Sequence, residues 1–155
     1  MRTWSKRQFE KDFEKKFRKE IRLRKLLKKN DTLDIAPNKD SNTFVARYML
    51  KNLGLPLRFA KSGKKILAWS QEKEIEEFLR DLFSGKLPKK HDKRIKIMKT
   101  IPQSEINAFA KLKGYKGKYI GQNNILEFVE KIEKKHGDLK SATAKAIQKI
   151  KDLIE

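Results

Sequence analysis

The sequence predicts an α/β fold: a small, helix-rich domain with three or four short strands and a long basic N-terminal helix. Apolar residues recur at helical spacing in several segments, and short apolar runs of strand length lie between them. A chain of 155 residues with 37% hydrophobic residues can bury a single core. We expect a basic helix over 1–30, a reduced α/β core over 31–118 and a C-terminal helical pair over 119–155.

The first region predicts one helix from Ser5 to Lys29. Its apolar stripe repeats every four residues, at Phe9, Phe13, Phe17 and Ile21. Leu26 and Leu27 extend the stripe. We expect these side chains to pack in the core rather than to stack on bases.

A strand-like run, Thr32–Ala36, follows this helix, and the next helix covers Ser41–Asn52 and is closed by Gly54. Two further strand-like runs, Leu55–Ala60 and Lys65–Trp69, are separated by only four residues. Because a parallel crossover needs about a dozen residues or more, we expect these two runs to form an antiparallel hairpin.

Helices alternate with one more strand in the rest of the chain. Ser70 is a candidate cap for the next helix, and Pro102 fits the first helical position of a later one. Gly85 and Gly114 end these two helices. The expected elements are the helix Gln71–Ser84, the strand Arg94–Thr100, the helix Pro102–Lys113 and the helices Asn123–His136 and Leu139–Ile154.

Charge is the most unusual property of the sequence. Forty Lys and Arg residues against twenty Asp and Glu give a net charge of +20. Residues 1–30 carry thirteen basic and four acidic residues, and residues 86–118 carry eleven and two, so each block has a net charge of +9. An excess this large opposes folding by self-repulsion and indicates a polyanionic partner.

We therefore predict that the two blocks contact phosphate. The segment Gly114–Gly121, with alternating Tyr and Lys on a glycine-rich backbone, suits RNA because rings stack on bases. An ordinary loop with the tyrosines packed beneath it is the alternative. The candidate RNA-binding residues are Lys6, Arg7, Lys11, Lys15, Lys16, Arg18, Arg22, Lys25, Lys89, Lys90, Lys93, Arg94, Lys113, Tyr115, Lys116 and Lys118.

Several classes of site are excluded or disfavoured by composition. The sequence contains no cysteine, which excludes disulfides, Cys-ligated metal and a thiol nucleophile. His91 and His136 lie in unrelated segments, so no metal site is expected. No apolar run approaches the length of a membrane span, and no N-terminal signal is apparent. We expect a cytoplasmic protein without a cofactor.

The run FEKKFRKEIRLRKLLKKNDTLDIAPNKDS is continued by NTFVARYMLKNLG. Together they resemble the basic helix, first strand and phosphate-loop helix of one family, the PP-loop ATP-pyrophosphatase core of archaeal-type tRNA 2-thiouridine synthetases. RIKIMKTIPQSEINAFAKLKG and FVEKIEKKHG are similar to its C-terminal strand, Pro-led helix and closing helix. The resemblance implies a reduced PP-loop/HUP-like sheet and action on folded tRNA.

The departures from the family pattern imply a degenerate and truncated relative. The family's Ser-Gly-Gly-x-Asp-Ser loop aligns with residues 36–41, where Pro37 lacks an N–H donor and the glycines are absent. The residues of this degenerate nucleotide loop are Asn38, Lys39, Asp40 and Ser41. The family's Gly-His-Asn-x-Asp-Asp element would fall at 68–73, with Trp69 in place of His and Lys73 breaking the acidic pair. The family's cysteines have no counterpart.

The sequence thus predicts a non-catalytic protein that docks on structured RNA, either rRNA as a ribosomal or ribosome-associated protein, or tRNA. The alternative is an ATP-dependent tRNA-modifying enzyme or subunit that adenylates tRNA. Ribosomal or tRNA-modification proteins are further candidate partners, through residues 119–155. DNA and acidic membranes share the charge argument but are less favoured.

Overall fold

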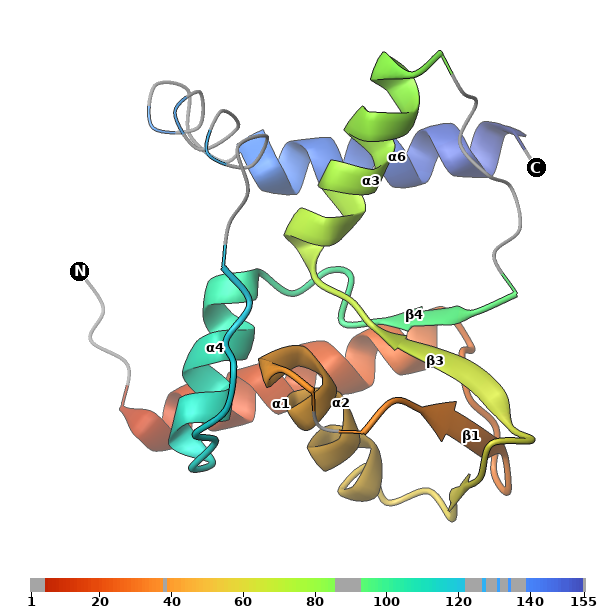
Figure 1. Ribbon diagram of the computed structural model, residues 1–155, viewed down its shortest axis with the longest axis vertical. Helices are drawn as coiled ribbons and strands as arrows, with labels where there is room; N and C mark the ends of the chain where they lie inside the picture. Colours follow the sequence, from red (N-terminus) through yellow and green to blue (C-terminus); the bar gives the residue numbers. More distant parts are fainter. Residues whose placement is uncertain are drawn as a thin grey trace.

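The computed structural model describes residues 5–37, 39–85, 93–121 and 139–154, together with 127, 131 and 134. Helices and strands alternate along most of this length, and Figure 1 shows their arrangement. The elements are α1 (Lys6–Leu23), β1 (Thr32–Ile35), α2 (Ser41–Lys51), β2 (Arg58–Phe59), β3 (Lys64–Ala68), α3 (Gln71–Phe83), β4 (Ile95–Ile97), α4 (Gln103–Leu112) and α6 (Leu139–Ile154).

The four strands form one sheet in the order β2-β1-β3-β4, and every neighbouring pair is parallel. Helix α2 links β1 to β2, and α3 links β3 to β4, as in other open α/β sheets. The predicted α/β class with short strands and a long N-terminal helix is therefore confirmed. The expected helix Asn123–His136 lies largely outside the described residues.

The expected antiparallel hairpin is wrong. Strands β2 and β3 do not pair with each other but lie on either side of β1, parallel to it. Phe59 and Lys64 both stand opposite Leu33, so the connection only moves sideways across one strand. That distance is about two strand spacings, roughly 10 Å, which four residues span easily. The length rule for crossovers applies to strands whose connection must return along their length, which these do not.

Gly63 makes this short crossing possible. A Cβ placed on Gly63 would lie 2.5 Å from the carbonyl carbon and oxygen of Thr32 in β1. No side chain fits at that distance because the obstacle is backbone, which cannot rotate away. The glycine thus lets the chain pass directly against β1.

Helix α1 is shorter than the sequence indicates. Its start follows the prediction, with Ser5 and Gln8 forming a capping box. It ends at Leu23, because Lys25 adopts a left-handed conformation (φ 48°). Leu27 is still buried, but it reaches the core from the loop after the helix. The phenylalanine stripe packs as expected: Phe13 and Phe17 are fully buried, and Phe13 stacks on Phe109 of α4.

The other described helices lie close to their predicted ranges. Ser70 caps α3 through the backbone N–H of Lys73, as predicted. Pro102 occupies the N-cap of α4 rather than its first helical position. Helix α6 covers the predicted residues and packs against α3, with Ile147 buried between them.

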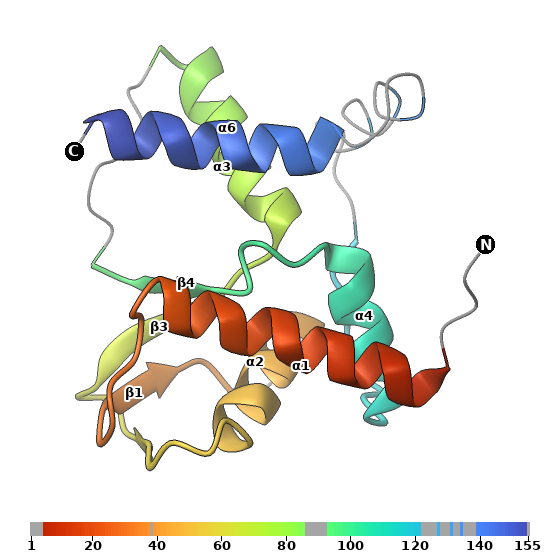
Figure 2. The ribbon, with the colours of Figure 1, turned by 180° about the vertical axis from the view of Figure 1, so that it is seen from behind.

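Figure 2 shows α1 as the outermost element on its side of the molecule, in front of α2 and alongside β4. The buried residues of α1 belong to the same core as Leu33, Ile66 and Ile97 of the sheet. This packing holds α1 rigidly and turns its other face to solvent. The division into regions 1–30, 31–118 and 119–155 stays a prediction.

Candidate nucleic-acid interface

The solvent face of α1 carries a dense group of cations. At about 100° per residue, six basic positions fall within an arc of roughly 120°, opposite the phenylalanine stripe. We call this group the α1 cationic row; it consists of Arg7, Lys11, Lys15, Arg18, Lys19 and Arg22. All six are exposed. A shallow hollow of about 440 Å³ runs among them, lined also by Glu14.

The charges of this row are left without acidic partners. Among the described residues, none of its six members forms a salt bridge, and only Arg18 hydrogen-bonds to the protein through its cationic group. Lys6 and Lys25, predicted beside them, are also exposed. Cations that the protein leaves unneutralised are available to an external polyanion.

Two of the predicted RNA-binding residues on α1 make hydrogen bonds within the protein instead. Lys16 bridges Asp12 of its own helix and Glu105 of α4, at 3.0 and 2.9 Å. Burial favours the neutral amine, but these hydrogen bonds raise the pKa of Lys16 above its usual value. Arg18 donates to the carbonyl oxygens of Leu53 and Asn52, at 2.9 and 3.0 Å, just beyond the end of α2. A cation is favourable there because carbonyls at a helix C-terminus lack partners.

The second basic block meets α1 near its beginning. Lys113 pairs with Glu10 of α1 at 3.3 Å and lies over the rings of Tyr48 and Phe109. Burial lowers the pKa of Lys113, but the contacts with Glu10 and Tyr48 outweigh it and raise the pKa overall. Lys116 and Lys118 are exposed on the following loop. The two blocks therefore adjoin at this end of α1.

The tyrosines of this loop are packed by their own chain. Tyr115 stacks on Phe44 with ring centres 4.8 Å apart and meets Tyr119 edge to face. The Tyr119 hydroxyl donates to the Tyr115 carbonyl oxygen at 2.6 Å. For Tyr115 this arrangement matches the alternative interpretation of the segment, an ordinary loop with the ring beneath it, whereas Tyr119 is 38% exposed. The expected contact of Tyr115 with RNA stays a prediction.

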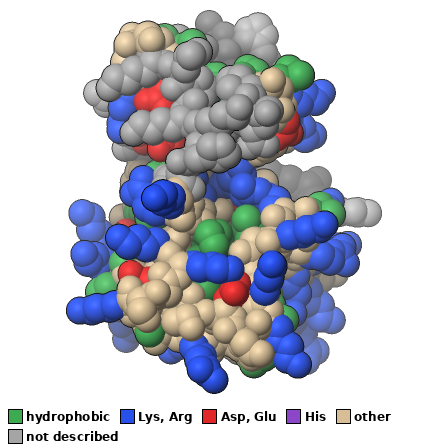
Figure 3. Space-filling view, turned by 90° about the vertical axis from the view of Figure 1, so that its right-hand side faces the viewer, with side chains coloured by type: hydrophobic (Ala, Val, Ile, Leu, Met, Phe, Trp, Pro, Cys, Tyr) green, Lys and Arg blue, Asp and Glu red, His purple; other side chains and the backbone are tan. Residues whose placement is uncertain are grey.

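The rest of the second block is only partly described. Lys93 and Arg94 are exposed just before β4, which lies near the C-terminal end of α1 in Figures 1 and 2. Lys89 and Lys90 lie outside the described residues. Figure 3 shows Lys and Arg on both flanks of the lower half of the molecule. Exposed lysines outside both blocks, at Lys51, Lys61 and Lys65, contribute to this broader distribution.

Four N–H groups in and just after the loop before α2, those of Lys39, Asp40, Ser41 and Thr43, donate to the protein's own oxygen atoms. Asp40 caps α2 by accepting from the backbone N–H of Thr43 at 2.8 Å, and the N–H groups of Lys39 and Asp40 donate to the Thr43 hydroxyl. The N–H of Ser41 donates to the carbonyl oxygen of Lys118 at 2.9 Å. Asn38 lies outside the described residues. The segment that follows α4 thus covers the position where a phosphate would sit.

A buried amide network supports this cover, although the sequence patterns did not predict it. The Ser41 hydroxyl donates to Asn107 at 2.8 Å and accepts from the N–H of Ile120, whose carbonyl accepts from Asn107. Gln103 joins Asn107 to Asn42, and its backbone N–H donates to Glu72 of α3 at 2.7 Å. The signal was present in the sequence, since Gln103 and Asn107 are four apart on the apolar side of their helix.

These contacts occupy the carboxyl ends of β1 and β3, where open α/β sheets bind their ligands. The N-termini of α2, α3 and α4 meet there and are joined to one another by hydrogen bonds of the protein itself. Ser41, Asn42 and Glu72 are each at most 3% exposed. The arrangement stabilises the fold and leaves little polar surface for a nucleotide at this position.

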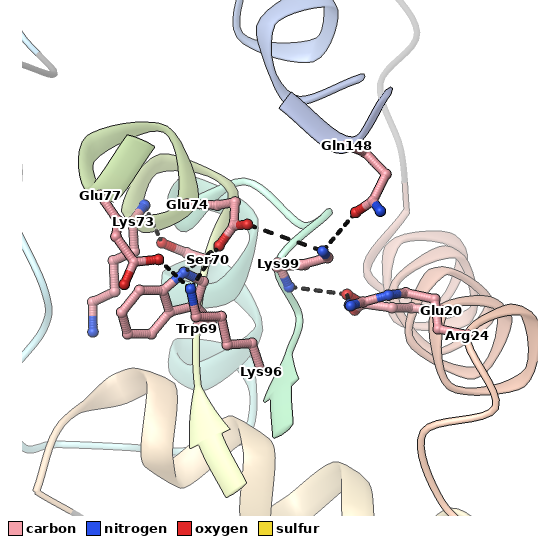
Figure 4. Close-up of polar contacts among 10 residues, drawn as sticks. All are labelled: Glu20, Arg24, Trp69, Ser70, Lys73, Glu74, Glu77, Lys96, Lys99 and Gln148. Carbon is pink, nitrogen blue, oxygen red and sulfur yellow. Dashed lines mark hydrogen bonds and ion pairs between the residues drawn. The ribbon is translucent and has the colours of Figure 1, made fainter. Parts of the chain in front are cut away.

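The residues aligned with the family's second motif form a separate charged cluster (Figure 4). The indole of Trp69 donates to Glu74 at 3.0 Å, and the ammonium group of Lys96 lies 4.6 Å from the ring centre. Lys96 also pairs with Glu74 and Glu77. Trp69 therefore stands in a network of ion pairs rather than offering an imidazole for catalysis.

Lys99 and Glu20 extend the cluster towards α1. Lys99 donates to the Gln148 side chain of α6 at 2.7 Å, while its backbone N–H donates to Glu20 at 3.1 Å. One carboxylate oxygen of Glu20 is buried without a hydrogen-bond partner. Burial raises the pKa of Glu20, although Arg24 and the backbone N–H groups of Met98 and Lys99 oppose that shift.

A cavity of about 450 Å³ lies beside this cluster, between α3 and α6. Its lining combines cations such as Arg24 and Lys145 with Glu74 and apolar residues of α6. In the part of the chain that the structure describes, no group of three or more His, Cys, Asp or Glu residues is placed to hold a metal ion. None of the described helices is long and apolar enough to cross a membrane.

No family model and no curated protein matches this sequence. Among solved structures, the chain is similar to the U34-tRNA thiolase NcsA from Methanococcus maripaludis, described with its [4Fe-4S] cluster. The TM-score is 0.76 at 12% identity, and the likeness covers 99% of this chain and 82% of the thiolase chain. This result confirms the predicted resemblance at the level of the fold. The similarity does not test whether the chain is a degenerate or truncated relative of that family. Nothing in the comparisons supports a ribosomal protein or an archaeal origin.

Proposed function

We propose that this protein binds tRNA through the α1 cationic row and acts in tRNA modification as a binding component. The observation that carries the proposal is the row itself. Within the described residues none of its six cations forms a salt bridge, and Arg18 alone is hydrogen-bonded by the protein, on a helix that the core holds in place. Lysine and arginine side chains so arranged bind phosphate without reading base sequence.

The choice of tRNA among polyanions rests on the fold. The thiolase that shares it acts on tRNA, as its name states. No comparable support exists for rRNA, so tRNA takes precedence over the ribosomal partner that the sequence also allowed. A role in the cytoplasm and contacts with modification proteins through residues 119–155 remain part of the proposal.

Two features support binding without catalysis by this chain. The N–H groups of Lys39, Asp40, Ser41 and Thr43 donate to the protein's own oxygen atoms, which makes these four unavailable to ATP phosphates. The sequence has no cysteine to carry sulfur or to ligate an iron–sulfur cluster. Sulfur chemistry on tRNA would have to come from another protein.

A second candidate is an ATP-dependent enzyme or subunit that adenylates tRNA. The likeness to a tRNA-modifying enzyme favours this candidate over binding alone, while the occupied donors favour binding. Lys39, Asp40 and Ser41 remain at the positions of the family's loop. ATP–pyrophosphate exchange in the presence of tRNA distinguishes the two: exchange that is lost in Asp40→Asn would establish the enzyme.

Filter binding of labelled tRNA to the full chain tests the leading proposal. Affinity should fall by orders of magnitude between about 50 and 200 mM salt, because phosphate contacts release counterions. A flat salt profile would rule out binding driven by phosphate. Bulk rRNA fragments serve as the competing partner, and their preference over tRNA would restore the ribosomal hypothesis.

A further inference from the structure

We infer that the α1 cationic row recognises the backbone of a helical RNA stem and not unpaired bases. This inference rests on the proposed binding of tRNA and adds to it the part of the molecule that is bound. Three properties of α1 carry it: the spacing of its cations, the absence of a stacking platform on that face and the engagement of its amide side chain.

The spacing of the cations is regular and fixed. Arg7, Lys11, Lys15 and Lys19 follow one another at four-residue intervals, which is about 6 Å along a helix axis. From Arg7 to Arg22 the row extends for about 22 Å. The buried rings of Phe13 and Phe17 hold the backbone beneath it. A row of charges on a backbone that the core holds in place fits a strand whose phosphates are also held at regular spacing, as in a duplex.

The exposed face of α1 has no aromatic ring on which an unpaired base could stack. Phe13 and Phe17 are fully buried, and Phe9 packs against the core. On the loop after α4, Tyr115 stacks on Phe44, and Tyr119, which is 38% exposed, meets Tyr115 edge to face. Proteins that bind single-stranded RNA depend on such stacking, which contributes about 1–3 kcal/mol per base.

Apart from its charged residues, α1 has one side chain suited to reading base edges. Gln8 is its only amide residue, and its side-chain oxygen accepts from the backbone N–H of Ser5. The members of the row are all Lys or Arg, whose long side chains reach phosphate at many angles. Glu14 lines the same hollow and repels phosphate, so it bounds the row on one side.

The test is competition for the full chain between labelled tRNA and two unlabelled RNAs: a hairpin with a continuous stem, and a single strand of equal length and composition. The hairpin should compete within about 3-fold of tRNA, and the single strand at least about 10-fold less well. An oligolysine peptide, measured with the same hairpin and single strand, shows how strongly charge density alone prefers the hairpin. The protein should prefer the hairpin over the single strand more strongly than the peptide does.

Matched variants assign the effect to the row. Lys11→Gln, Lys15→Gln and Arg22→Gln together should lower the salt slope of hairpin binding by about 3, one for each phosphate that the row no longer neutralises. Lys61→Gln, Lys65→Gln and Lys149→Gln remove the same charge from exposed positions elsewhere and should leave the slope nearly unchanged. Circular dichroism on both variants confirms that they fold.

The outcomes separate this inference from the proposed function. If tRNA binds but the single strand competes as well as the hairpin, or if the protein's preference equals that of oligolysine, the inference is wrong while tRNA binding stands. An equal reduction of slope in the two triple variants also overturns it. If neither tRNA nor the hairpin binds, the proposed function fails, and the inference fails with it.

Discussion

The loop before α2 and the solvent face of α1 are the two parts of this molecule best suited to phosphate, and the fold treats them differently. At the loop, four N–H groups donate to Pro37, Thr43, Asp40 and Lys118 of the same chain. On α1, none of the six exposed cations of the row forms a salt bridge within the described residues, and five of them also lack a hydrogen bond from their charged group to the protein. These four N–H donors of the loop are therefore occupied by the protein itself, whereas the cations of α1 are available to an external anion.

The difference shows that a chain can keep a fold while the position that usually binds the ligand is occupied by the protein's own groups. A helix N-terminus binds an anion only when its N–H groups have no other partner. Here a neighbouring loop supplies carbonyl oxygens to those groups, so the position contributes to stability. The excess positive charge cannot be neutralised within the chain in the same way, because the chain has half as many acidic as basic residues.

The largest expected effect comes from reversing the charge of the row. Changing Lys11, Lys15, Lys19 and Arg22 to Glu should weaken tRNA binding at least about 100-fold near 100 mM salt, since phosphate contacts become repulsive. Filter binding measures the change. Reversal at Lys61, Lys65 and Lys149 is the control, and a similar loss there would mean that charge acts without regard to position.

The next effect concerns stability at the loop before α2. Asn107→Ala removes one hydrogen-bond partner from each of three groups: the Ser41 hydroxyl, the Ile120 carbonyl and the Gln103 amide. Loss of these hydrogen bonds in a largely buried network should lower the free energy of unfolding by about 1–3 kcal/mol. Urea denaturation measures this loss, with Ser104→Ala on the exposed side of α4 as control. If affinity for tRNA falls while stability does not, the loop contacts RNA after all.

A smaller effect should appear in the pH dependence of stability. Because burial raises the pKa of Glu20, the folded protein binds its proton more tightly than the unfolded chain does. The cost of the buried charge is therefore relieved as the pH falls through the folded pKa. The free energy of unfolding of the wild type, relative to Glu20→Gln, should rise as the pH is lowered towards 4.5, the ordinary pKa of a glutamate. A constant difference would show that Glu20 does not titrate there.

The smallest effect is expected at the loop itself. Lys39→Gln should change tRNA affinity by less than about 2-fold. A ligand that binds the folded state raises the melting temperature, so millimolar ATP should leave the melting temperature of the wild type unchanged if the loop does not bind it. Thermal unfolding with and without ATP measures this. A rise that Asp40→Asn abolishes would show that the loop binds ATP and would favour the adenylating enzyme.

Local patterns predicted most of the elements correctly, for reasons that reside in neighbouring residues. The four-residue phenylalanine repeat marked α1, and Ser70 marked the start of α3. The same patterns misjudged the end of α1, because Leu26 and Leu27 continue the apolar stripe although Lys25 leaves the helical conformation. They also could not show that Lys16 and Arg18 would be engaged by Glu105 and by the end of α2.

By itself the sequence determined the α/β class, the amphipathic character of α1 and the uncompensated positive charge, because these depend on composition and on spacing along one segment. The order of strands around β1, the short passage at Gly63 and the closure of the α2 loop by residues 118–120 were decided only by tertiary structure. Each of these depends on which distant backbone atoms come within hydrogen-bonding or van der Waals distance, and no local pattern encodes that.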